Sequence, residues 1–264
     1  MQKRESSSIY QLRLFHNWIK KQLITDAVKY LDKPDIKLLD LAVGKGGDIN
    51  KWVTNKIKYV VGFDIDKDSI LEANKRYKQM NIHTYHDYHF YELDLSKSTS
   101  IKIVTDMTHN TKFDIVSCQF AIHYFFKNNE TLHTILEIVS NSLKTGGIFI
   151  GTTMNGDLIK TKSDLHLHND IFTIKKGDGN KYIVSLGKSS DKDHYFVDYD
   201  SEEYYVEMKR FKEEAIKYDL HFVGTIDFET WFGKYDGKLS NDEKEFSFMN
   251  ISFMFVKTAA KTLI

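Results

Sequence analysis

LLDLAVGKGGDINKW, residues 38–52, is the stretch of sequence that decides the fold. An apolar run leads to Asp40, and three of the chain's 14 glycines then fall within four positions, before a helical pattern begins at Asp48. Because glycine has no side chain, a glycine-rich turn between a strand and a helix lets a ligand approach the backbone closely. The stretch therefore predicts a cofactor site at the end of the first strand of an α/β sheet.

Apolar runs and helical patterns alternate along the first 153 residues. This order predicts a central parallel sheet with helices on both faces. The sequence KTGG at 144–147 is expected to end the helix that precedes it. Strands are expected at 37–43, 59–65, 113–120 and 148–153, with a looser one in 85–95, and helices at 10–31, 48–55, 68–80 and 132–143.

The pattern loosens after residue 155. Residues 160–200 are polar with short β-like runs, as in an inserted flap, and 209–218 read as a helix. The runs at 221–227 and 250–257 are expected to form a final antiparallel pair of strands. Neither an internal repeat nor a linker divides the chain, so the sequence predicts one domain over 1–264, with an N-terminal helix at 10–31 and a flap at about 160–200.

Composition narrows the class of protein. The chain has 264 residues, of which 28% are charged, and its net charge is zero. A neutral chain is not expected to coat nucleic acid along its whole surface, although it can hold a local basic pocket. One cysteine, Cys118, permits no intramolecular disulfide and fits a reducing compartment. No apolar run approaches the roughly 20 residues of a membrane span, so an intracellular protein without a membrane partner is expected.

The acids around the glycine turn distinguish two classes of cofactor. Dinucleotide sites use G-x-G-x-x-G, but Ile49 stands at the third glycine position, and Asp40 and Asp48 would repel a pyrophosphate. S-adenosylmethionine has no phosphate and carries a cationic sulfonium, so it suits these acids better. Asp64, at the end of the second strand, is placed to accept from both ribose hydroxyls, and Asp94, closing the third, to meet the adenine amine. The alternative is a structural turn with helix-capping acids.

Several motifs together resemble one protein family. LRLFHNWIKKQLI (12–24), LDLAVGKGGD (39–48), FDIVSCQFAIHYFF (113–126) and GGIFIGTTMNGDLI (146–159) are similar to the mRNA cap guanine-N7 methyltransferases, and weaker similarity continues through 203–220. TTMNGDL (152–158) looks most like the methyltransferase domain of the capping enzymes of large cytoplasmic DNA viruses. The resemblance implies a Rossmann-like class I SAM-dependent methyltransferase, with a mostly parallel central sheet, helices on both faces and a terminal antiparallel strand.

The resemblance assigns cofactor roles position by position. Lys20 matches the lysine that pairs with the methionine carboxylate, and Ala42 stands where the family has the first glycine of its loop. Gln119 and Tyr124 match residues that line the cofactor. The residues expected to bind S-adenosylmethionine are Lys20, Asp40, Ala42, Gly44, Asp64, Asp94, Gln119 and Tyr124.

The same comparison assigns a site for the cap. His16 and Asn17 match an Asn-Asn pair, so His16 departs from the pattern, and Asn250 stands where a tyrosine is usual. Lys45 and Arg76 match basic residues near the cap phosphates. The residues expected to bind the cap are His16, Asn17, Lys45, Arg76, His123 and Glu203.

The chemistry implied for this site needs no general base. Guanine N7 carries a lone pair and no proton, so attack on the methyl group is a direct displacement that depends on alignment. Glu203 is expected to accept from guanine N1–H and the N2 amine, and His123 to donate to O6. His123, Tyr124 and Glu203 are therefore expected to position the reactants, and the carboxylate to stabilise the positive charge that develops on the ring.

The resemblance thus implies an enzyme that converts GpppN to m7GpppN on capped RNA. The expected protein partners are the triphosphatase and guanylyltransferase part of a capping enzyme, or a small stimulatory subunit. The expected location is the cytoplasm (a viral factory or the virion) for a viral protein and the nucleus for a cellular one. Two alternatives stay open: a SAM-dependent methyltransferase of a small molecule, and a cap-binding domain without turnover.

Other polar clusters are expected to be structural. No metal site is expected, and Cys118 is expected to be a small buried residue and not a nucleophile. The histidines expected to lie on polar loops or strands are His83, His86, His89, His166 and His168, and the lysines expected on a solvated face are Lys37, Lys51, Lys56 and Lys58.

Overall fold

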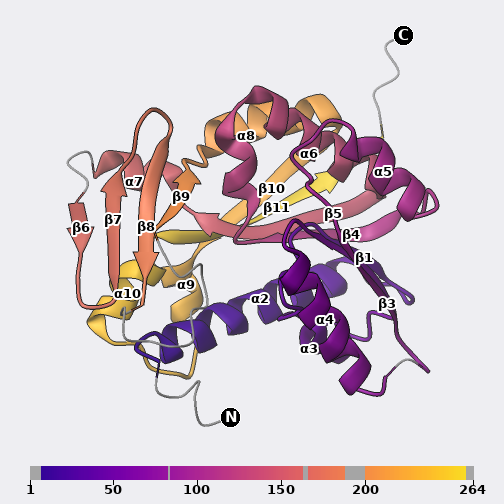
Figure 1. Ribbon diagram of the computed structural model, residues 1–264, viewed down its shortest axis with the longest axis horizontal. Helices are drawn as coiled ribbons and strands as arrows, with labels where there is room; N and C mark the ends of the chain where they lie inside the picture. The colour runs from indigo at the N-terminus through magenta and orange to yellow at the C-terminus, as the bar shows by residue number, and fades with distance from the viewer. Residues whose placement is uncertain (1–6, 83, 163–165, 188–199, 260–264) are drawn as a thin grey trace.

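A seven-stranded sheet forms the centre of the computed structural model, which describes residues 7–82, 84–162, 166–187 and 200–259. The spatial order is β10-β11-β5-β4-β1-β2-β3, in which β11 runs antiparallel to both of its neighbours, β10 and β5, and all other neighbouring strands are parallel (Figure 1). This confirms the predicted sheet and its final antiparallel pair. The strands are β1 (Lys37–Asp40), β2 (Tyr59–Asp64), β3 (Asp87–Glu92), β4 (Phe113–Gln119), β5 (Leu143–Met154), β10 (Leu220–Asp227) and β11 (Asn250–Lys257).

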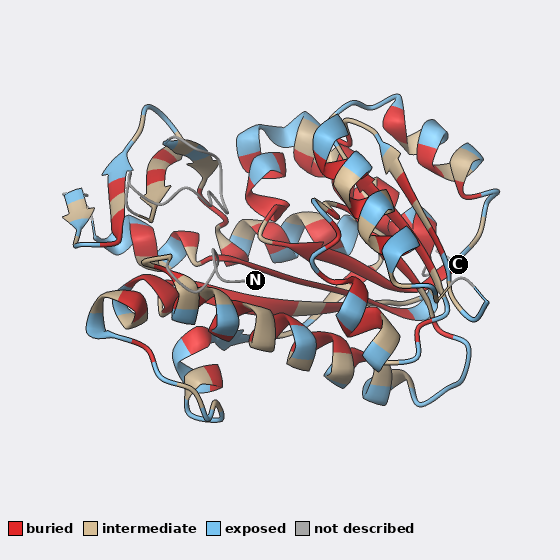
Figure 2. Ribbon diagram, turned by 60° about the horizontal axis from the view of Figure 1, so that its bottom comes forward, coloured by how far each residue is buried: buried red, intermediate tan, exposed pale blue. Residues whose placement is uncertain are grey.

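Helices cover both faces of this sheet, as the alternating pattern predicts (Figure 1). One face carries α2 (Tyr10–Leu31), α3 (Ile49–Thr54) and α4 (Lys67–Gln79), and the other carries α5 (Ser100–Met107), α6 (Asn129–Ser142) and α8 (Met208–Ala215). Figure 2 shows the sheet buried between helices whose outer faces are exposed. Within the described ranges, none of the helices combines the length and the apolar character that crossing a bilayer requires.

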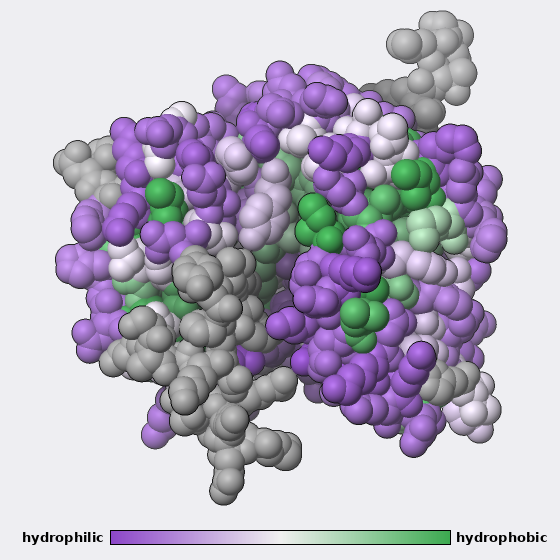
Figure 3. All heavy atoms as spheres, in the orientation of Figure 1, coloured by the Kyte–Doolittle hydropathy of each residue, from purple (hydrophilic) through white to green (hydrophobic). Residues whose placement is uncertain are grey.

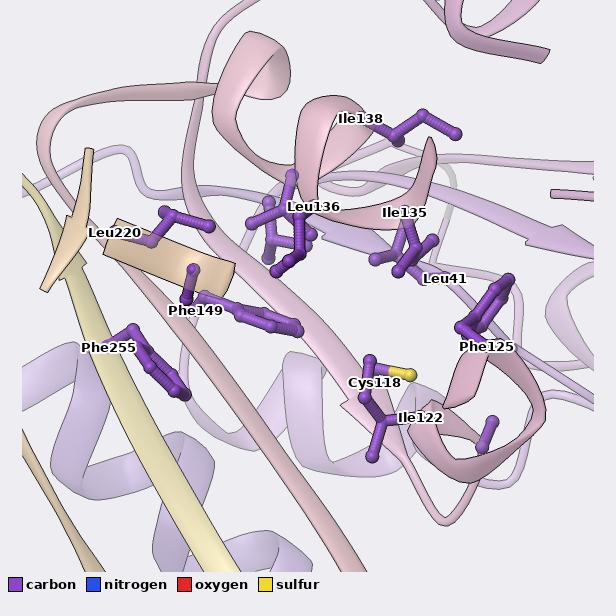
Figure 4. Packing of buried hydrophobic residues seen from close by; sticks show 14 of the residues in the cluster. Leu41, Cys118, Ile122, Phe125, Ile135, Leu136, Ile138, Phe149, Leu220 and Phe255 are labelled. Atoms are coloured by element: carbon purple, nitrogen blue, oxygen red, sulfur yellow. The ribbon is translucent and has the colours of Figure 1, made fainter. Parts of the chain in front are cut away.

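The core explains why the central strands read as continuous apolar runs. Every residue of β4 is buried, since helices pack on both sides of it. Phe149, Phe255 and Leu136 pack together with Cys118 in the cluster drawn in Figure 4. Cys118 is fully buried, as predicted, and burial raises the pKa of its thiol. A thiol in this position packs as a small apolar side chain.

A second, smaller sheet is inserted in the chain between β5 and β10 of the large one. Its order is β6-β7-β8-β9, all antiparallel, and its first three strands fall within residues 160–200, where short β-like runs were expected. It packs on α7 (Gly156–Thr161), on the first turn of α2 and on α10 (Asn241–Ser247). Residues 163–165 and 188–199 of the predicted flap lie outside the described residues. The strands are β6 (His166–His168), β7 (Phe172–Lys176), β8 (Lys181–Leu186) and β9 (Ser201–Tyr204).

Several sequence predictions about element ends were wrong. The strand predicted at 37–43 ends at Asp40, where the glycine turn begins. The KTGG segment does not form a separate stop, because the chain passes from Ser142 directly into β5 through an extended Leu143. The predicted strand at 113–120 ends one residue early, since Phe120 adopts a left-handed φ of 53°. Five short helices were not predicted. They are α5, α7, α9 (Phe228–Phe232), α10 and the 3-10 helix η1 (Ile122–Lys127). These elements span 8 residues or fewer, so their helical periodicity is weak, although α3 and α8 are as short and were predicted.

The glycine turn has two separate geometric functions. Gly46 has a φ of +70°, and a Cβ there would lie 2.8 Å from Ile49 Cδ1 and 3.2 Å from Ala73 Cα of α4. Gly44, with a φ of +50°, has open space instead, and its N–H donates to Asp64 Oδ2 at 2.7 Å. One glycine therefore brings the turn close to α4, and the other presents its backbone to the carboxylate that ends β2.

Gly46→Ala should lower the free energy of unfolding by at least about 2 kcal/mol, because the side chain adds a left-handed penalty to a steric overlap. Urea unfolding measures this difference. Gly224→Ala in β10 is the matched control, since a Cβ there meets nothing within 4 Å, and its effect should stay below about 1 kcal/mol. Equal effects of the two substitutions would contradict the packing role of Gly46.

Candidate active site

The carboxyl ends of four strands bring the predicted polar residues to one edge of the large sheet. Asp40 ends β1, Asp64 ends β2 and Gln119 ends β4, while Asp94 follows β3 by two residues. Parallel strands present their carboxyl ends at the same edge, where α/β proteins bind ligands. The regular alternation of strands and helices is therefore what assembles this site from residues far apart in sequence.

A cleft of about 710 Å³ lies at this edge. Its walls include Ala42, Asp64, Asp94 and Tyr124 of the predicted cofactor residues, and apolar side chains such as Leu95. The volume lies within the range of roughly 300–1,000 Å³ that small-molecule sites occupy. In Figure 3 the face toward the viewer is hollowed between the small sheet and the α3–α4 side, with hydrophobic residues beside the hollow.

Two carboxylates in the cleft are held by backbone groups. Asp64 accepts from the N–H of Gly44 at 2.7 Å and of Asp66 at 2.9 Å. Asp94 accepts from the N–H and the hydroxyl of Ser96 at 3.0 and 2.6 Å. Burial acts to raise the pKa of Asp94, but the bonds from Ser96 hold it below its ordinary value. Both side chains are therefore oriented acceptors, suited to the hydroxyl and amine donors of a nucleoside.

A buried ion cluster lies beside the glycine turn. Asp48 Oδ1 accepts from Lys20 Nζ at 2.7 Å and from Lys51 Nζ at 2.6 Å, and all three side chains are only 10% exposed. Burial acts to raise the pKa of Asp48, but the two lysines hold it well below its ordinary value. Asp48 makes no side-chain hydrogen bond to the start of α3, so the helix-capping interpretation is wrong for this residue.

The placement of Lys51 contradicts the sequence prediction. Lys56 and Lys58 are exposed and Lys37 is half-buried, but Lys51 is buried and not part of a solvated face. Its ammonium group also donates to Gly47 O at 3.0 Å and to Asn17 Oδ1 at 2.9 Å. The prediction failed because the sequence does not show that α2 packs against this side of α3.

Asp40 has the most unusual electrostatic position at this edge. It is 1% exposed, and burial together with the neighbouring Asp48 raises its pKa from 3.8 to about 7. Its Oδ1 accepts from the N–H of Ala42 at 3.1 Å, which lowers the pKa in part, as does Lys20. Near neutral pH this carboxyl is therefore only partly ionised.

Three of the predicted cap residues line a second, smaller cavity. His16 of α2, His123 of η1 and Glu203 of β9 meet there, together with Asn250 of β11. The cavity measures about 40 Å³, little more than the roughly 30 Å³ that one water occupies in the liquid. Entry of a purine base would therefore require the side chains around it to move apart.

His123 is buried without a hydrogen bond. Neither ring nitrogen has a hydrogen-bond partner among the described residues, and Nε2 lies 3.7 Å from Glu203 Oε1. Burial lowers the pKa of His123, against the opposing effect of Glu203, so the ring is neutral and carries one N–H. A buried polar group without a partner is rare and costs free energy, so this ring is suited to meet a ligand.

Tyr182 orients the carboxylate beside this histidine, a contact that the sequence did not suggest. Its hydroxyl donates to Glu203 Oε2 at 2.6 Å, and burial and the Glu203 charge both raise the pKa of the phenol. On the opposite wall His16 bonds to Ser247 Oγ at 2.8 Å and stacks on Phe120. Burial and Lys20 lower the pKa of His16 to about 3, so this ring is neutral as well.

Tyr124 connects the cleft with the smaller cavity. It lines the cleft, and its ring centroid lies 4.1 Å from that of His123. Partial burial and the carboxylates of Glu203 and Asp64 raise the pKa of its phenol. Tyr124 therefore borders the cleft and contacts a ring that lines the smaller cavity, so ligands in the two spaces would meet near it.

The structure does not place the remaining predicted residues at these walls. Gln119 bonds to Ser117 and Thr152, and Asn17 to Arg13 O and Lys51. Seven of the predicted site residues line neither the cleft nor the smaller cavity: Lys20, Asp40, Gly44, Gln119, Asn17, Lys45 and Arg76. Arg76 bonds to Glu72 at 3.0 Å and, together with the weaker effect of exposed Lys45, lowers the pKa of that acid. The two cations therefore share one neighbourhood, and their roles stay predictions.

The remaining histidines of the described residues form no metal-binding cluster. Within the described ranges, no three residues of the His, Cys, Asp and Glu types group in a way that could hold a metal ion. His89 pairs with Asp87 at 2.8 Å, and His166 and His168 are exposed on β6. His83 lies outside the described residues.

Comparisons with known proteins identify a single family. The family profile of the mRNA (guanine-N(7))-methyltransferase domain matches residues 1–249. The mRNA cap guanine-N(7) methyltransferase of Caenorhabditis briggsae is 40% identical over 163 residues, covering 60% of this chain and 43% of the relative. The mRNA cap guanine-N(7) methyltransferase 1 of Arabidopsis thaliana is 33% identical over 238 residues, covering 84% of this chain and 62% of the relative. The chain thus spans less than two thirds of the length of these relatives.

A solved structure supports the fold. A S-adenosylmethionine-dependent methyltransferase from Clostridium acetobutylicum superposes with a TM-score of 0.62 at 17% identity, covering 93% of this chain and 92% of its own. This confirms the predicted Rossmann-like class I methyltransferase fold.

The raised pKa of Asp40 predicts a pH-dependent effect of Asp40→Asn in the ligand-free protein. Because the folded-state pKa lies above 3.8, the stability that the protonated carboxyl contributes is lost as the pH rises through about 7. The free energy of unfolding of the variant should therefore increase relative to wild type as the pH rises from 3.8 to about 7, and this difference should level off above pH 7. Urea unfolding at a series of pH values measures the difference. A constant difference would contradict the assignment.

Proposed function

We propose, since the chain belongs to the mRNA (guanine-N(7))-methyltransferase family, that it transfers a methyl group from S-adenosylmethionine to N7 of the guanine cap of mRNA, converting GpppN to m7GpppN. The curated relatives carry this activity in their names. The single observation in the structure that supports it most is His123, a buried neutral ring without a hydrogen-bond partner among the described residues, facing Glu203.

The cleft suits S-adenosylmethionine, which would supply an electrophilic methyl group. Asp64 and Asp94 would accept from the ribose hydroxyls and the adenine amine, because their oxygens are already oriented by backbone N–H groups. Lys20 would pair with the methionine carboxylate at the turn end of the site. Asp40, where ionised, would favour the cationic amino and sulfonium groups, whereas the charge of Asp48 is already balanced by Lys20 and Lys51.

The smaller cavity suits guanine once its walls move apart. Glu203 would accept from N1–H and the N2 amine, and Tyr182 would hold this carboxylate in place through its hydroxyl. His123 would donate its one N–H to O6. Adenine presents an acceptor at N1 and an amine at C6, so both groups would face it unfavourably, which supports selection of guanine.

The arrangement supports methyl transfer without a general base. N7 carries no proton, and none of the chain's groups needs to remove one. The contribution of the protein is to hold the nucleophile close to the methyl donor, with Tyr124 between the two spaces. The Glu203 carboxylate would stabilise the positive charge that the ring acquires on methylation.

The deciding experiment is incubation with labelled S-adenosylmethionine and RNA ending in GpppG or GpppA, followed by identification of the methylated atom. Label at guanine N7 would support the proposal, and label at any other atom would contradict it. Tight binding of the cap dinucleotide without turnover would favour a non-catalytic cap-binding domain. A small-molecule methyltransferase would leave capped RNA unlabelled and would not bind it.

The proposal extends to partners and location. Capped RNA is the substrate that it requires. The protein partners would be the triphosphatase and guanylyltransferase part of a capping enzyme or a small stimulatory subunit, and the place of action the cytoplasm for a viral protein or the nucleus for a cellular one. Copurification from the native source would test the partners, and fractionation of the source cells would test the location.

Asp64→Ala should weaken binding of S-adenosylmethionine by about 1–3 kcal/mol, because two ribose hydroxyls lose an oriented charged acceptor. Isothermal titration calorimetry measures this change. Asp66→Ala is a suitable control, since Asp66 is exposed and its side chain caps α4. Unchanged affinity of Asp64→Ala would remove this residue from the cofactor site.

Glu203→Gln should lower turnover at least about tenfold, roughly 1.4 kcal/mol, while affinity for S-adenosylmethionine stays nearly unchanged. The substitution keeps the shape but removes the charge and one acceptor oxygen. Glu202→Gln is the matched control, because Glu202 is the exposed neighbour that pairs with Lys181 at 2.7 Å. Turnover is compared under saturating S-adenosylmethionine with capped RNA. Wild-type turnover in Glu203→Gln, or loss only in Glu202→Gln, would exclude Glu203 from the guanine site.

A further inference from the structure

Lys51 is a buried lysine to which neither the sequence analysis nor the proposed chemistry assigns a role. It is 8% exposed, and its ammonium group donates to Asp48 Oδ1, Gly47 O and Asn17 Oδ1 at 2.6, 3.0 and 2.9 Å. These acceptors belong to the glycine turn and to α2. A lysine that gives up its hydration for three oriented acceptors is held in one place, because its burial would otherwise be unfavourable.

The carboxylate of Asp48 is shared between two ammonium groups. Lys20 and Lys51 approach the same atom, Oδ1, at 2.7 and 2.6 Å. Two positive charges and one negative charge leave these three groups with a net charge of +1. Asp40, the next acid, is only partly ionised near neutral pH and does not cancel this charge fully. A buried excess of positive charge favours an anion at this end of the site.

We propose that Lys51 is a positioning residue for the cofactor: it balances Asp48, so that Lys20 can pair with the carboxylate of the methionine part of S-adenosylmethionine. This inference rests on the proposed function. Without Lys51, Asp48 and Lys20 form a neutral pair, and the incoming carboxylate must compete with Asp48 for the only remaining ammonium group of the cluster. With Lys51, the cluster keeps one positive charge for the ligand and Asp48 keeps a partner.

Two ligands that differ only at the amino-acid end separate this role from a general one. S-adenosylhomocysteine carries the amino and carboxylate groups, and 5′-methylthioadenosine keeps the adenosine part but lacks both. Calorimetry measures the affinity of each ligand for wild type, Lys51→Met and Lys51→Gln. Lys51→Gln retains amide donors toward Gly47 and Asn17 without the charge. Lys58→Met is the control, because Lys58 is 63% exposed and pairs with Asp35 at the surface.

Loss of the Lys51 charge should weaken binding of S-adenosylhomocysteine at least about tenfold, while 5′-methylthioadenosine changes by less than about twofold. Lys51→Arg should restore most of the affinity for S-adenosylhomocysteine, since it returns the charge. Lys58→Met should bind both ligands as wild type does. Thermal unfolding of each variant shows whether it is folded. If Lys51→Met does not fold, the affinities of Lys51→Gln for the two ligands decide whether Lys51 positions the cofactor.

Other outcomes would overturn the inference in distinguishable ways. Equal losses for both ligands would mean that Lys51 only supports the turn, and unchanged affinity for S-adenosylhomocysteine would mean that it plays no part in binding. Failure of wild type to bind S-adenosylhomocysteine would overturn the proposed function itself, together with the role of Lys51.

Discussion

The buried carboxylate of Asp48 fixes how the N-terminal helix meets the sheet. An ionised group inside a protein is tolerated only where other groups compensate for its lost hydration, and here lysines from α2 and α3 do so at 2.7 and 2.6 Å. These contacts, together with the buried apolar face of α2, hold the rotation of this helix about its axis. His16 lies one turn before Lys20 on this helix, so the same rotation places it at the wall of the smaller cavity.

The two spaces of the site depend on different parts of the fold. The cleft follows from the parallel strands, because their carboxyl ends converge wherever strands and helices alternate. The smaller cavity requires the added small sheet, which supplies Glu203, and the turn after β4, which supplies His123 through η1. The left-handed Phe120 begins that turn, and unusual backbone geometry of this kind gathers at functional sites. Tyr124, four residues on, connects the two spaces.

The sequence predicts the large sheet well because its signals are local. The helix at 10–31 and the final strand at 250–257 have the predicted bounds, since apolar periodicity and flanking polar residues mark their ends. The ion cluster and the Tyr182–Glu203 bond could not be predicted, because they join segments with no common periodicity. The spacing of Asp48 and Lys51, three residues apart on a helix, was the only available signal, and an exposed pair has the same spacing.

The histidines of the smaller cavity show what kind of chemistry it can support. Burial keeps both His16 and His123 neutral, so neither ring would bring a positive charge toward a base in this cavity. A cationic wall would oppose a reaction that makes guanine positive, whereas neutral rings and one carboxylate favour it. The proposed cofactor end differs, because there an excess cationic charge from Lys20 and Lys51 would suit a carboxylate. The positive charges of Lys20 and Lys51 and the negative charge of Glu203 thus lie at different ends of the proposed site. The methyl group would move from the cofactor in the cleft toward the guanine beside Glu203.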